Sequence, residues 1–156
     1  MNQHQAKTAQ SELWNYTNQR LKTPDGWSLS VHRLQPKRPG SEVPVVCLPG
    51  HGTTAWTLYG GANGGLAGAL AGSGRDVWLL DPRGCGESAH RSGRKPVRIR
   101  EKFSLDLPCF LAHVASVTGS QTVDAMGHSL GAFWSICMHS WNCLLYTSPS
   151  PRDQLQ

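Results

Sequence analysis

The residues with the clearest chemical potential are Gly127-His128-Ser129-Leu130-Gly131, which place a serine between two glycines. This pattern comes directly after a short apolar run that is expected to be a buried strand, and directly before an expected helix. A turn this tight requires glycine at both flanking positions, and it raises the serine hydroxyl above the sheet. The N-terminus of the following helix also favours negative charge on a substrate oxygen. We therefore predict that Ser129 is a nucleophile for acyl transfer. The alternative is a glycine-serine turn that only caps a helix.

A second loop could stabilise the charge that forms during such a reaction. A glycine-rich loop centred on His51 and Gly52 ends the first buried apolar run of the sequence. The backbone N–H of Thr53, or that of Thr54, is expected to join the N–H of Leu130 as the pair of donors that forms an oxyanion hole. We interpret His51 as a brace for this loop, because the general base in this arrangement follows the serine in the chain.

The elements that must position these loops begin with a hairpin over 14–34, whose turn is Thr23-Pro24-Asp25-Gly26. Two short apolar runs, at 43–48 and 76–81, do not alternate with polar residues, as is typical of parallel strands buried on both faces. A third short strand, also expected to be buried, lies at 122–126.

Helices are expected between and after these strands, over 62–73, 107–117 and 130–141. In the first, Leu66 and Leu70 have helical spacing. In the second, Asp106 is the expected N-cap and Gly119 ends the helix. Because strands and helices alternate, the sequence predicts an α/β fold. Its sheet would be mostly parallel, with an antiparallel hairpin at the N-terminus and helices on both faces.

Charge and cysteine content limit the other classes of function. The 156 residues carry a net charge of +5, and the run from Arg91 to Lys102, with six bases and one acid, accounts for all of it. We interpret this run as a solvated surface loop, so no nucleic-acid partner is expected; binding of an anionic partner is the alternative. Five cysteines without a CxxC pair argue against a disulfide framework and a zinc site. No signal peptide or membrane span is recognisable, so a cytoplasmic location is expected.

These residues together resemble the α/β-hydrolases. The landmarks are the 24–26 turn, the His51-Gly52 loop, the segment 76–84 and the 127–131 elbow, in this order and spacing. The hairpin and the stretch 66–78 are most similar to acid-lipase-like esterases. Asp106-Leu107-Pro108 and Thr118-Gly119 are similar to polyhydroxyalkanoate-synthase-like relatives, which use cysteine as the nucleophile. The resemblance implies hydrolysis of small or lipid esters through an acyl-enzyme, without a cofactor or metal. Acyl transfer remains the alternative reaction.

The resemblance also implies an acid and then a histidine after the serine, and the sequence does not supply them in that order. After Ser129 the histidine is His139 and the acid is Asp153. His139 lies ten residues along the expected helix, about 15 Å of axial rise, which is too far for proton transfer. Residues 144–153 resemble the translation of a sequencing adapter rather than a natural protein element. We expect three segments: a flexible N-terminus over 1–13, a partial hydrolase domain over 14–141 and a non-native tail over 142–156. Because the acid and the histidine are not identified, we expect the chain to show little or no turnover.

Overall fold

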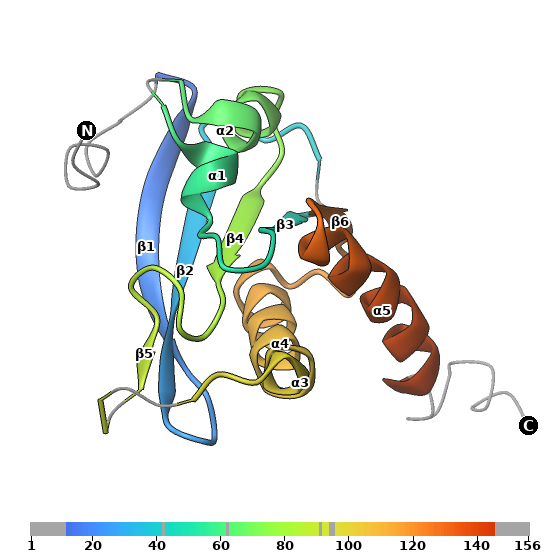
Figure 1. The fold of residues 1–156 in the computed structure, drawn as a ribbon. Coiled ribbons are helices and arrows are strands. Elements are labelled where there is room, and N and C mark those ends of the chain that lie inside the picture. Colours follow the sequence, from blue (N-terminus) through green and yellow to red (C-terminus); the bar gives the residue numbers. More distant parts are fainter. Residues whose placement is uncertain (1–11, 42, 62, 91, 94–95, 146–156) are drawn as a thin grey trace, which may run out of the picture.

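The structure is a computed structural model that describes residues 12–41, 43–61, 63–90, 92–93 and 96–145; of residues 138–145 it describes the backbone alone. Six strands form one sheet in the order β1-β2-β4-β3-β6, with β5 paired to β2 (Figure 1). The strands are β1 (Trp14–Lys22), β2 (Trp27–Pro36), β3 (Val45–Leu48), β4 (Val77–Asp81), β5 (Ala89–His90) and β6 (Asp124–Gly127). The helices are α1 (Trp56–Tyr59), α2 (Gly65–Gly72), α3 (Ile99–Glu101), α4 (Leu107–Thr118) and α5 (Leu130–Leu145).

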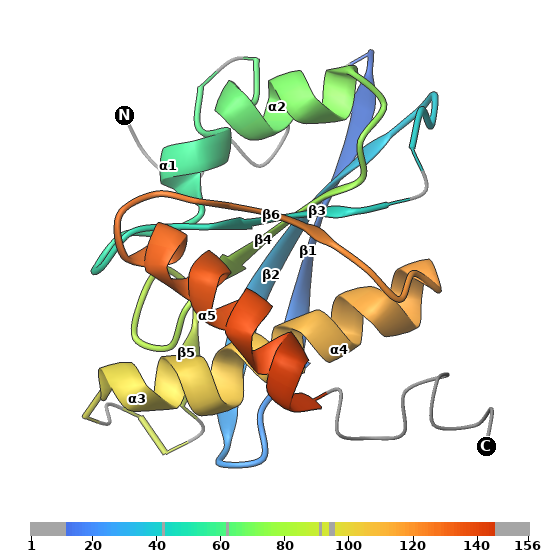
Figure 2. The same cartoon turned by 90° about the vertical axis from the view of Figure 1, so that its right-hand side faces the viewer.

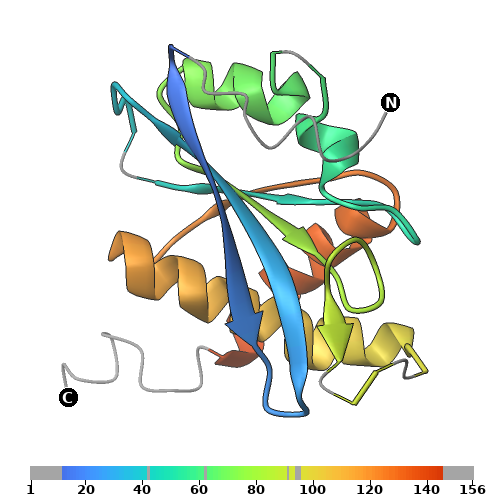
Figure 3. The same cartoon turned by 90° about the vertical axis from the view of Figure 1, so that its left-hand side faces the viewer.

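The N-terminal hairpin forms as the sequence predicts. β1 pairs antiparallel with β2 from Trp14 opposite Pro36 to Lys22 opposite Ser28. Gly26 adopts a φ of 93°, which favours glycine, and its N–H donates to the Thr23 carbonyl at 3.0 Å to close the turn. Figure 3 looks onto this hairpin and shows β1 as the outer strand of the sheet.

The three predicted strands form the parallel part of the sheet, β4-β3-β6. The expectation that the third strand is buried is wrong: Asp124 and Ala125 of β6 are exposed, because β6 is the last strand of the described sheet. All residues of β3 and β4 are buried, which explains why these runs do not alternate with polar residues. Parallel strands present their carboxyl ends at the same edge of a sheet. The loops that follow Leu48, Asp81 and Gly127 therefore meet at one edge, where the sequence predicts the site.

Helices cover both faces of the sheet, as predicted (Figure 2). α1 and α2 cover one face, and α3, α4 and α5 lie on the other. The apolar cluster under α4 and α5 is built from Trp27, Leu29, Val31, Val46, Leu48, Trp78, Leu80, Leu107, Phe110, Val114 and Trp134. The cluster under α1 and α2 is built from Trp14, Leu34, Val45, Cys47, Ala55, Leu58, Ala67, Ala71, Val77 and Leu79. No helix in the described part of the chain combines the length and the apolar character that a membrane crossing requires.

The helix expected over 62–73 is shorter than predicted, and of the two leucines with helical spacing Leu70 packs against the core whereas Leu66 does not. It begins at Gly65, and Ala67 and Ala71 face the core, whereas Leu66 is 51% exposed. The reason is space. A Cβ at Gly68 would overlap the backbone carbonyl of Asn63. A Cβ at Gly64 would overlap the ring of Trp14 on β1. The small residues therefore let α2 approach β1 and β2 closely.

The prediction that Asp106 caps the helix over 107–117 is wrong. A π-helical turn, Lys102–Asp106, precedes α4, so Asp106 itself has helical φ and ψ and its side chain makes no cap hydrogen bond. Its carboxylate instead accepts hydrogen bonds from Arg83. The predicted end of the helix is confirmed, because Gly119 adopts a φ of 72° directly after Thr118.

The basic run over 91–102 is not wholly a solvated loop. Arg98 and Arg100 are exposed as expected, but residues 99–101 form α3, and the next residue, Lys102, is only 3% exposed. Its ammonium group donates to Cys85 Sγ at 3.8 Å. Arg91, Arg94 and Lys95 lie outside the described residues. The α5 helix extends through residue 145, past the boundary expected at 141, and residues 146–156 again lie outside the described part.

Candidate active site

The predicted elbow forms a strained turn between β6 and α5. Ser129 has a φ of 55°, and among the described residues it is the one non-glycine with positive φ. Such a backbone costs about 1–3 kcal/mol and persists where the surrounding structure imposes it, typically at functional sites. Ser129 is exposed at the carboxyl edge of the sheet, so its hydroxyl is accessible to a substrate.

Packing around the turn requires both flanking glycines, as the sequence predicts. A Cβ on Gly127 would overlap the backbone of Gly131, on the first turn of α5. A Cβ on Gly131 would lie 2.6 Å from the carbonyl carbon of Leu48 and 2.8 Å from the carbonyl oxygen of Pro49. The two glycines thus allow α5 to start directly against the end of β3. This close approach leaves the serine exposed at the tip.

The loop after β3 lies against the elbow. A Cβ on Gly50 would lie 3.4 Å from the Cβ of Ser129 and 3.3 Å from Nδ1 of His128, which is itself exposed. The structure therefore brings together the two segments from which the oxyanion donors are expected. Gly52 adopts a φ of 67°, so it turns the loop back toward α1.

The two expected oxyanion donors differ in their present partners. The N–H of Thr53 points back into its own loop and donates to the Gly50 carbonyl at 3.4 Å, a long hydrogen bond; the Thr53 hydroxyl donates to the same carbonyl at 3.0 Å. Leu130 is the first residue of α5, so no carbonyl four residues earlier within the helix accepts its N–H. The Leu130 N–H is thus better placed for a substrate oxygen than the Thr53 N–H.

The role expected for His51 is not supported, and another residue holds the loop. His51 is exposed, and no hydrogen bond or ion pair connects its ring to another described residue. Instead, Asp81 at the end of β4 accepts the N–H of Ala55 at 2.7 Å through Oδ1. The sequence signal was a carboxylate that ends a buried strand and precedes Pro82. Which group this carboxylate accepts from, the Ala55 N–H 26 positions earlier in the chain, becomes visible only in three dimensions.

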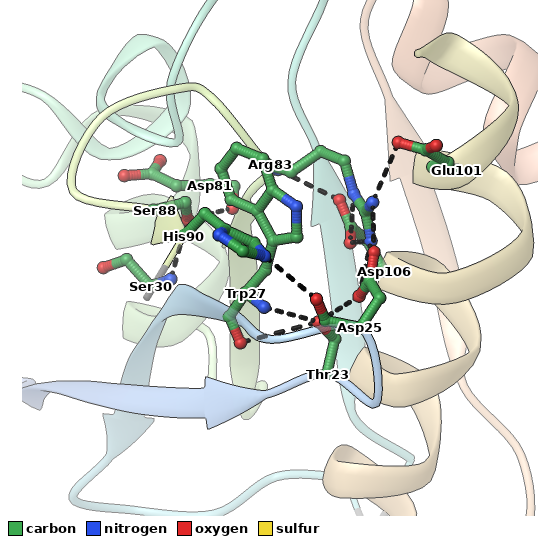
Figure 4. A network of polar contacts seen from close by, with 10 residues as sticks. All are labelled: Thr23, Asp25, Trp27, Ser30, Asp81, Arg83, Ser88, His90, Glu101 and Asp106. Carbon is green, nitrogen blue, oxygen red and sulfur yellow. Dashed lines mark hydrogen bonds and ion pairs between the residues drawn. The ribbon is translucent and has the colours of Figure 1, made fainter. Parts of the chain in front are cut away.

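Arg83 follows the end of β4 and forms a network of polar contacts with residues from three other segments (Figure 4). Its guanidinium group is fully buried and donates to Asp106 at 2.8 and 2.9 Å, to Asp25 at 2.7 Å and to Glu101 at 3.0 Å. The group also lies over the Trp27 ring, 5.4 Å from its centroid. One arginine thus connects the hairpin turn, α3 and the start of α4.

Burial and charge shift the titration of this network in opposite directions. Burial acts to lower the pKa of Arg83, but the hydrogen bonds that it donates to Asp106 and Asp25 outweigh burial and raise that pKa. At Asp25 burial acts to raise the pKa, and the bonds from Arg83 and Thr23 outweigh it, so the pKa lies below its ordinary value. Burial raises the pKa of Asp106, and the bonds from Arg83 limit that rise.

No general base is paired with the serine in the described part of the chain. Among residues 12–145 with the gaps given above, no hydrogen bond connects the Ser129 hydroxyl to a histidine. Position 139 lies within the α5 helix, but its side chain is outside the description, as is the whole of Asp153. The expectation that neither His139 nor Asp153 serves as the catalytic base or acid therefore stays untested by the geometry.

Comparisons with known proteins place this site in a family. The family model described as serine aminopeptidase, S33, matches residues 44–142, which is more than half of the chain. The chain therefore belongs to this family of α/β-hydrolases, in agreement with the resemblance seen in its motifs. The gastric triacylglycerol lipase of Rattus norvegicus is 32% identical over 135 residues, which cover 76% of this chain and 34% of the lipase.

Solved structures share the fold at lower identity. The esterase Pf2001 of Pyrococcus furiosus superposes with a TM-score of 0.63 at 23% identity, over 80% of this chain and 46% of the esterase. An α/β hydrolase of Novosphingobium aromaticivorans gives a TM-score of 0.63 at 24% identity, over 82% of this chain and 40% of that one. The chain thus spans about a third of the lipase and less than half of these structures.

Proposed function

We propose that this chain carries the nucleophile and oxyanion loop of a serine hydrolase that cleaves carboxylic esters through an acyl-enzyme. One observation carries the proposal: Ser129 has the positive φ of a strained elbow at a tip that Gly127 and Gly131 leave exposed. A residue that only capped α5 would not need this backbone conformation. The relationship to a gastric lipase supports lipid or other apolar esters as the substrates.

In the proposed mechanism, the Ser129 hydroxyl attacks the ester carbonyl and the alcohol leaves, so that an acyl-serine forms. The N–H of Leu130 donates to the carbonyl oxygen as it becomes negative, and the start of α5 adds its dipole. The N–H of Thr53 becomes the second donor if the loop releases its long bond to the Gly50 carbonyl. Water then hydrolyses the acyl-serine. An alcohol acceptor in place of water would turn hydrolysis into acyl transfer.

We also expect the 156-residue chain to turn esters over slowly or not at all. A positioned general base contributes about 10²–10⁴ in rate, and no described histidine is bonded to Ser129. The acid and the histidine of the complete machinery would then come from side chains other than the described ones. Added imidazole can replace a missing histidine side chain, because it is a small base of the same chemistry.

The experiment measures covalent modification of Ser129 by a fluorophosphonate and by a p-nitrophenyl ester, with and without imidazole. Intact-protein and peptide mass spectrometry are the readouts, because imidazole itself hydrolyses activated esters. We expect slow, stoichiometric labelling of Ser129 that imidazole accelerates by about tenfold or more.

Ser129→Ala should abolish this labelling, and Ser135→Ala is the matched control. Ser135 lies on the same helix, where its hydroxyl donates to the Gly131 carbonyl at 3.0 Å. Labelling that Ser129→Ala leaves unchanged would overturn the nucleophile assignment. Rapid Ser129-dependent turnover without imidazole would overturn the proposal that the chain turns esters over slowly or not at all.

A further inference from the structure

Asp81 connects the end of β4 to the loop beside the elbow. It is 3% exposed, and its Oδ1 accepts the N–H of Ala55, which is fully buried at the start of α1. Ala55 follows Thr53 and Thr54 directly, the two residues whose N–H groups were considered as oxyanion donors. The carboxylate therefore fixes one end of the oxyanion loop.

The second oxygen of Asp81 is held by a buried histidine. Nε2 of His32 on β2 lies 3.3 Å from Asp81 Oδ2, and both side chains are 5% exposed. Nδ1 of His32 lies 2.7 Å from the hydroxyl of Tyr16 on β1. Nε2 also lies 3.3 Å from the hydroxyl oxygen of Ser30. With the ring hydrogen on Nε2, facing the carboxylate, Nδ1 is free to accept from Tyr16. Burial raises the pKa of Tyr16, so its hydroxyl keeps the proton that it donates.

These contacts close a ring of interactions around α1. The ring of Tyr16 stacks on Tyr59 with the centroids 5.6 Å apart, and the His32 ring lies 5.1 Å from Tyr59. Tyr59 is the last residue of the helix that begins after Ala55. Both ends of α1 are thus connected to the same aspartate and histidine, one by a hydrogen bond and the other by aromatic packing.

The backbone around Asp81 is fixed as well. Ser88 donates its hydroxyl to the Asp81 carbonyl at 2.6 Å and accepts the N–H of Ser30 at 2.9 Å (Figure 4). Gly86 has a φ of 54°, and a Cβ there would lie 2.8 Å from Cγ of Asp81 and 3.2 Å from Cγ2 of Thr54. Glycine at this position thus lets the loop after β4 pack against both the carboxylate and the oxyanion loop.

The geometry points to Asp81 as a positioning residue for the oxyanion hole, held in its orientation by His32 and Tyr16. Asp81 touches no reacting atom; it sets the direction of the backbone N–H groups at 53–54 through its bond to Ala55. This inference rests on the proposed function of Ser129. Loss of one oxyanion donor costs about 10²–10³ in rate, which sets the scale of the expected effect.

The test compares Asp81→Ala with Asp81→Asn and with a control on the approach to the same strand. Asparagine keeps an oxygen that can accept the Ala55 N–H. Its NH₂ group can donate to His32 if the imidazole hydrogen moves to Nδ1, and the Tyr16 hydroxyl then accepts. The control is Asp76→Ala, because Asp76 precedes β4 at its other end and pairs with Arg33 at 2.7 and 2.8 Å.

The first measurement is amide hydrogen exchange of the peptides that cover 50–60, which does not depend on activity. We expect Asp81→Ala to raise exchange at Ala55 and its neighbours by tenfold or more. Asp81→Asn and Asp76→Ala should stay within about threefold of the wild type. Unchanged exchange in Asp81→Ala would overturn the inference.

The second measurement is the imidazole-promoted labelling rate of Ser129, expected to fall about 10²-fold in Asp81→Ala and to stay unchanged in Asp76→Ala. Equal labelling in Asp81→Ala and the wild type would refute the positioning role while the proposed function stands. If wild-type Ser129 is never labelled although the exchange result appears, the proposed function fails and the anchoring of the loop stands.

If Asp81→Ala does not fold, Tyr16→Phe replaces it, because this change removes only the hydroxyl that orients His32. Exchange at Ala55 should then rise about threefold, and Ser129 labelling should fall about threefold. Wild-type values in both measurements for a folded Tyr16→Phe protein would overturn the part of the inference that concerns His32 and Tyr16.

Discussion

Replacing Arg83 by methionine tests whether the buried ion network or the apolar core dominates the stability of this edge of the sheet. Arg83 and Asp106 are both fully buried, and the Asp106 carboxylate accepts three hydrogen bonds from Arg83. The backbone N–H of residue 83 can still donate, so two of the three are lost with the side chain. Breaking a buried pair in this way costs about 3–5 kcal/mol of unfolding free energy, because an uncompensated charge stays behind.

Two comparisons separate this cost from that of losing any arginine. Arg20 forms an ion pair with Glu87 at 2.7 Å, but their side chains are 47% and 37% exposed, so Arg20→Met should cost about 0–1 kcal/mol. The double change Arg83→Met with Asp106→Leu should recover about 2 kcal/mol or more of the loss, because a well-packed apolar pair can replace a buried ion pair.

The dependence on pH provides a further check. Without Arg83, burial should raise the pKa of Asp106 further above its ordinary value, so the folded variant binds a proton that the unfolded chain releases. The cost of Arg83→Met should therefore shrink as the pH falls from 7 to 5. Urea unfolding followed by tryptophan fluorescence measures this at each pH. A cost below about 1 kcal/mol at pH 7, or no recovery in the double variant, would refute the reasoning.

Three other outcomes are expected from the same structure. Gly131→Ala should lower the unfolding free energy in urea by about 3 kcal/mol or more, because the added Cβ meets rigid backbone. Gly119→Ala adds a Cβ in open space and should cost only about 1–2 kcal/mol, from its positive φ. Equal costs for the two variants would contradict this. Burial raises the pKa of Cys47 to about 12, so iodoacetamide at pH 8 should alkylate it only in denaturant, as peptide masses can verify. Burial, and to a lesser extent the charge of Arg33, lowers the pKa of His113. Below about pH 6.5 the unfolded chain therefore binds more protons at this residue than the folded chain does, which destabilises the fold. His113→Gln should reduce the loss of stability between pH 7 and 5.

Much of the fold was predictable because the signals were local. The hairpin turn at 23–26 and the end of α4 at Gly119 depend on backbone conformations that particular residue types favour. The apolar residues 77–80 of β4 predicted a strand buried on both faces, and it is one. These preferences act over a few residues, so the sequence displays them directly.

The errors lie where a distant segment competes for a side chain. Aspartate is a residue type that often caps helices, but the carboxylate of Asp106 accepts hydrogen bonds from Arg83, 23 positions earlier. Leu66 has the spacing of a core residue, but the close approach of α2 to the sheet favours Ala67 and Ala71 there. Lys102 belongs to a charged run, yet its ammonium group is buried beside Cys85. Local propensity does not contain the identity of these partners.

The sequence by itself determined the strained turn at Ser129, because a strand, a helix and two glycines around the serine are enough to specify it. It also determined the family, through the order and spacing of its motifs. Only the tertiary structure decided how the oxyanion loop is held. Tyr16, His32 and Asp81 lie on three different strands, and the residues between them show no common pattern. Their hydrogen bonds exist because sheet pairing brings β1, β2 and β4 side by side, and that pairing is a property of the whole fold.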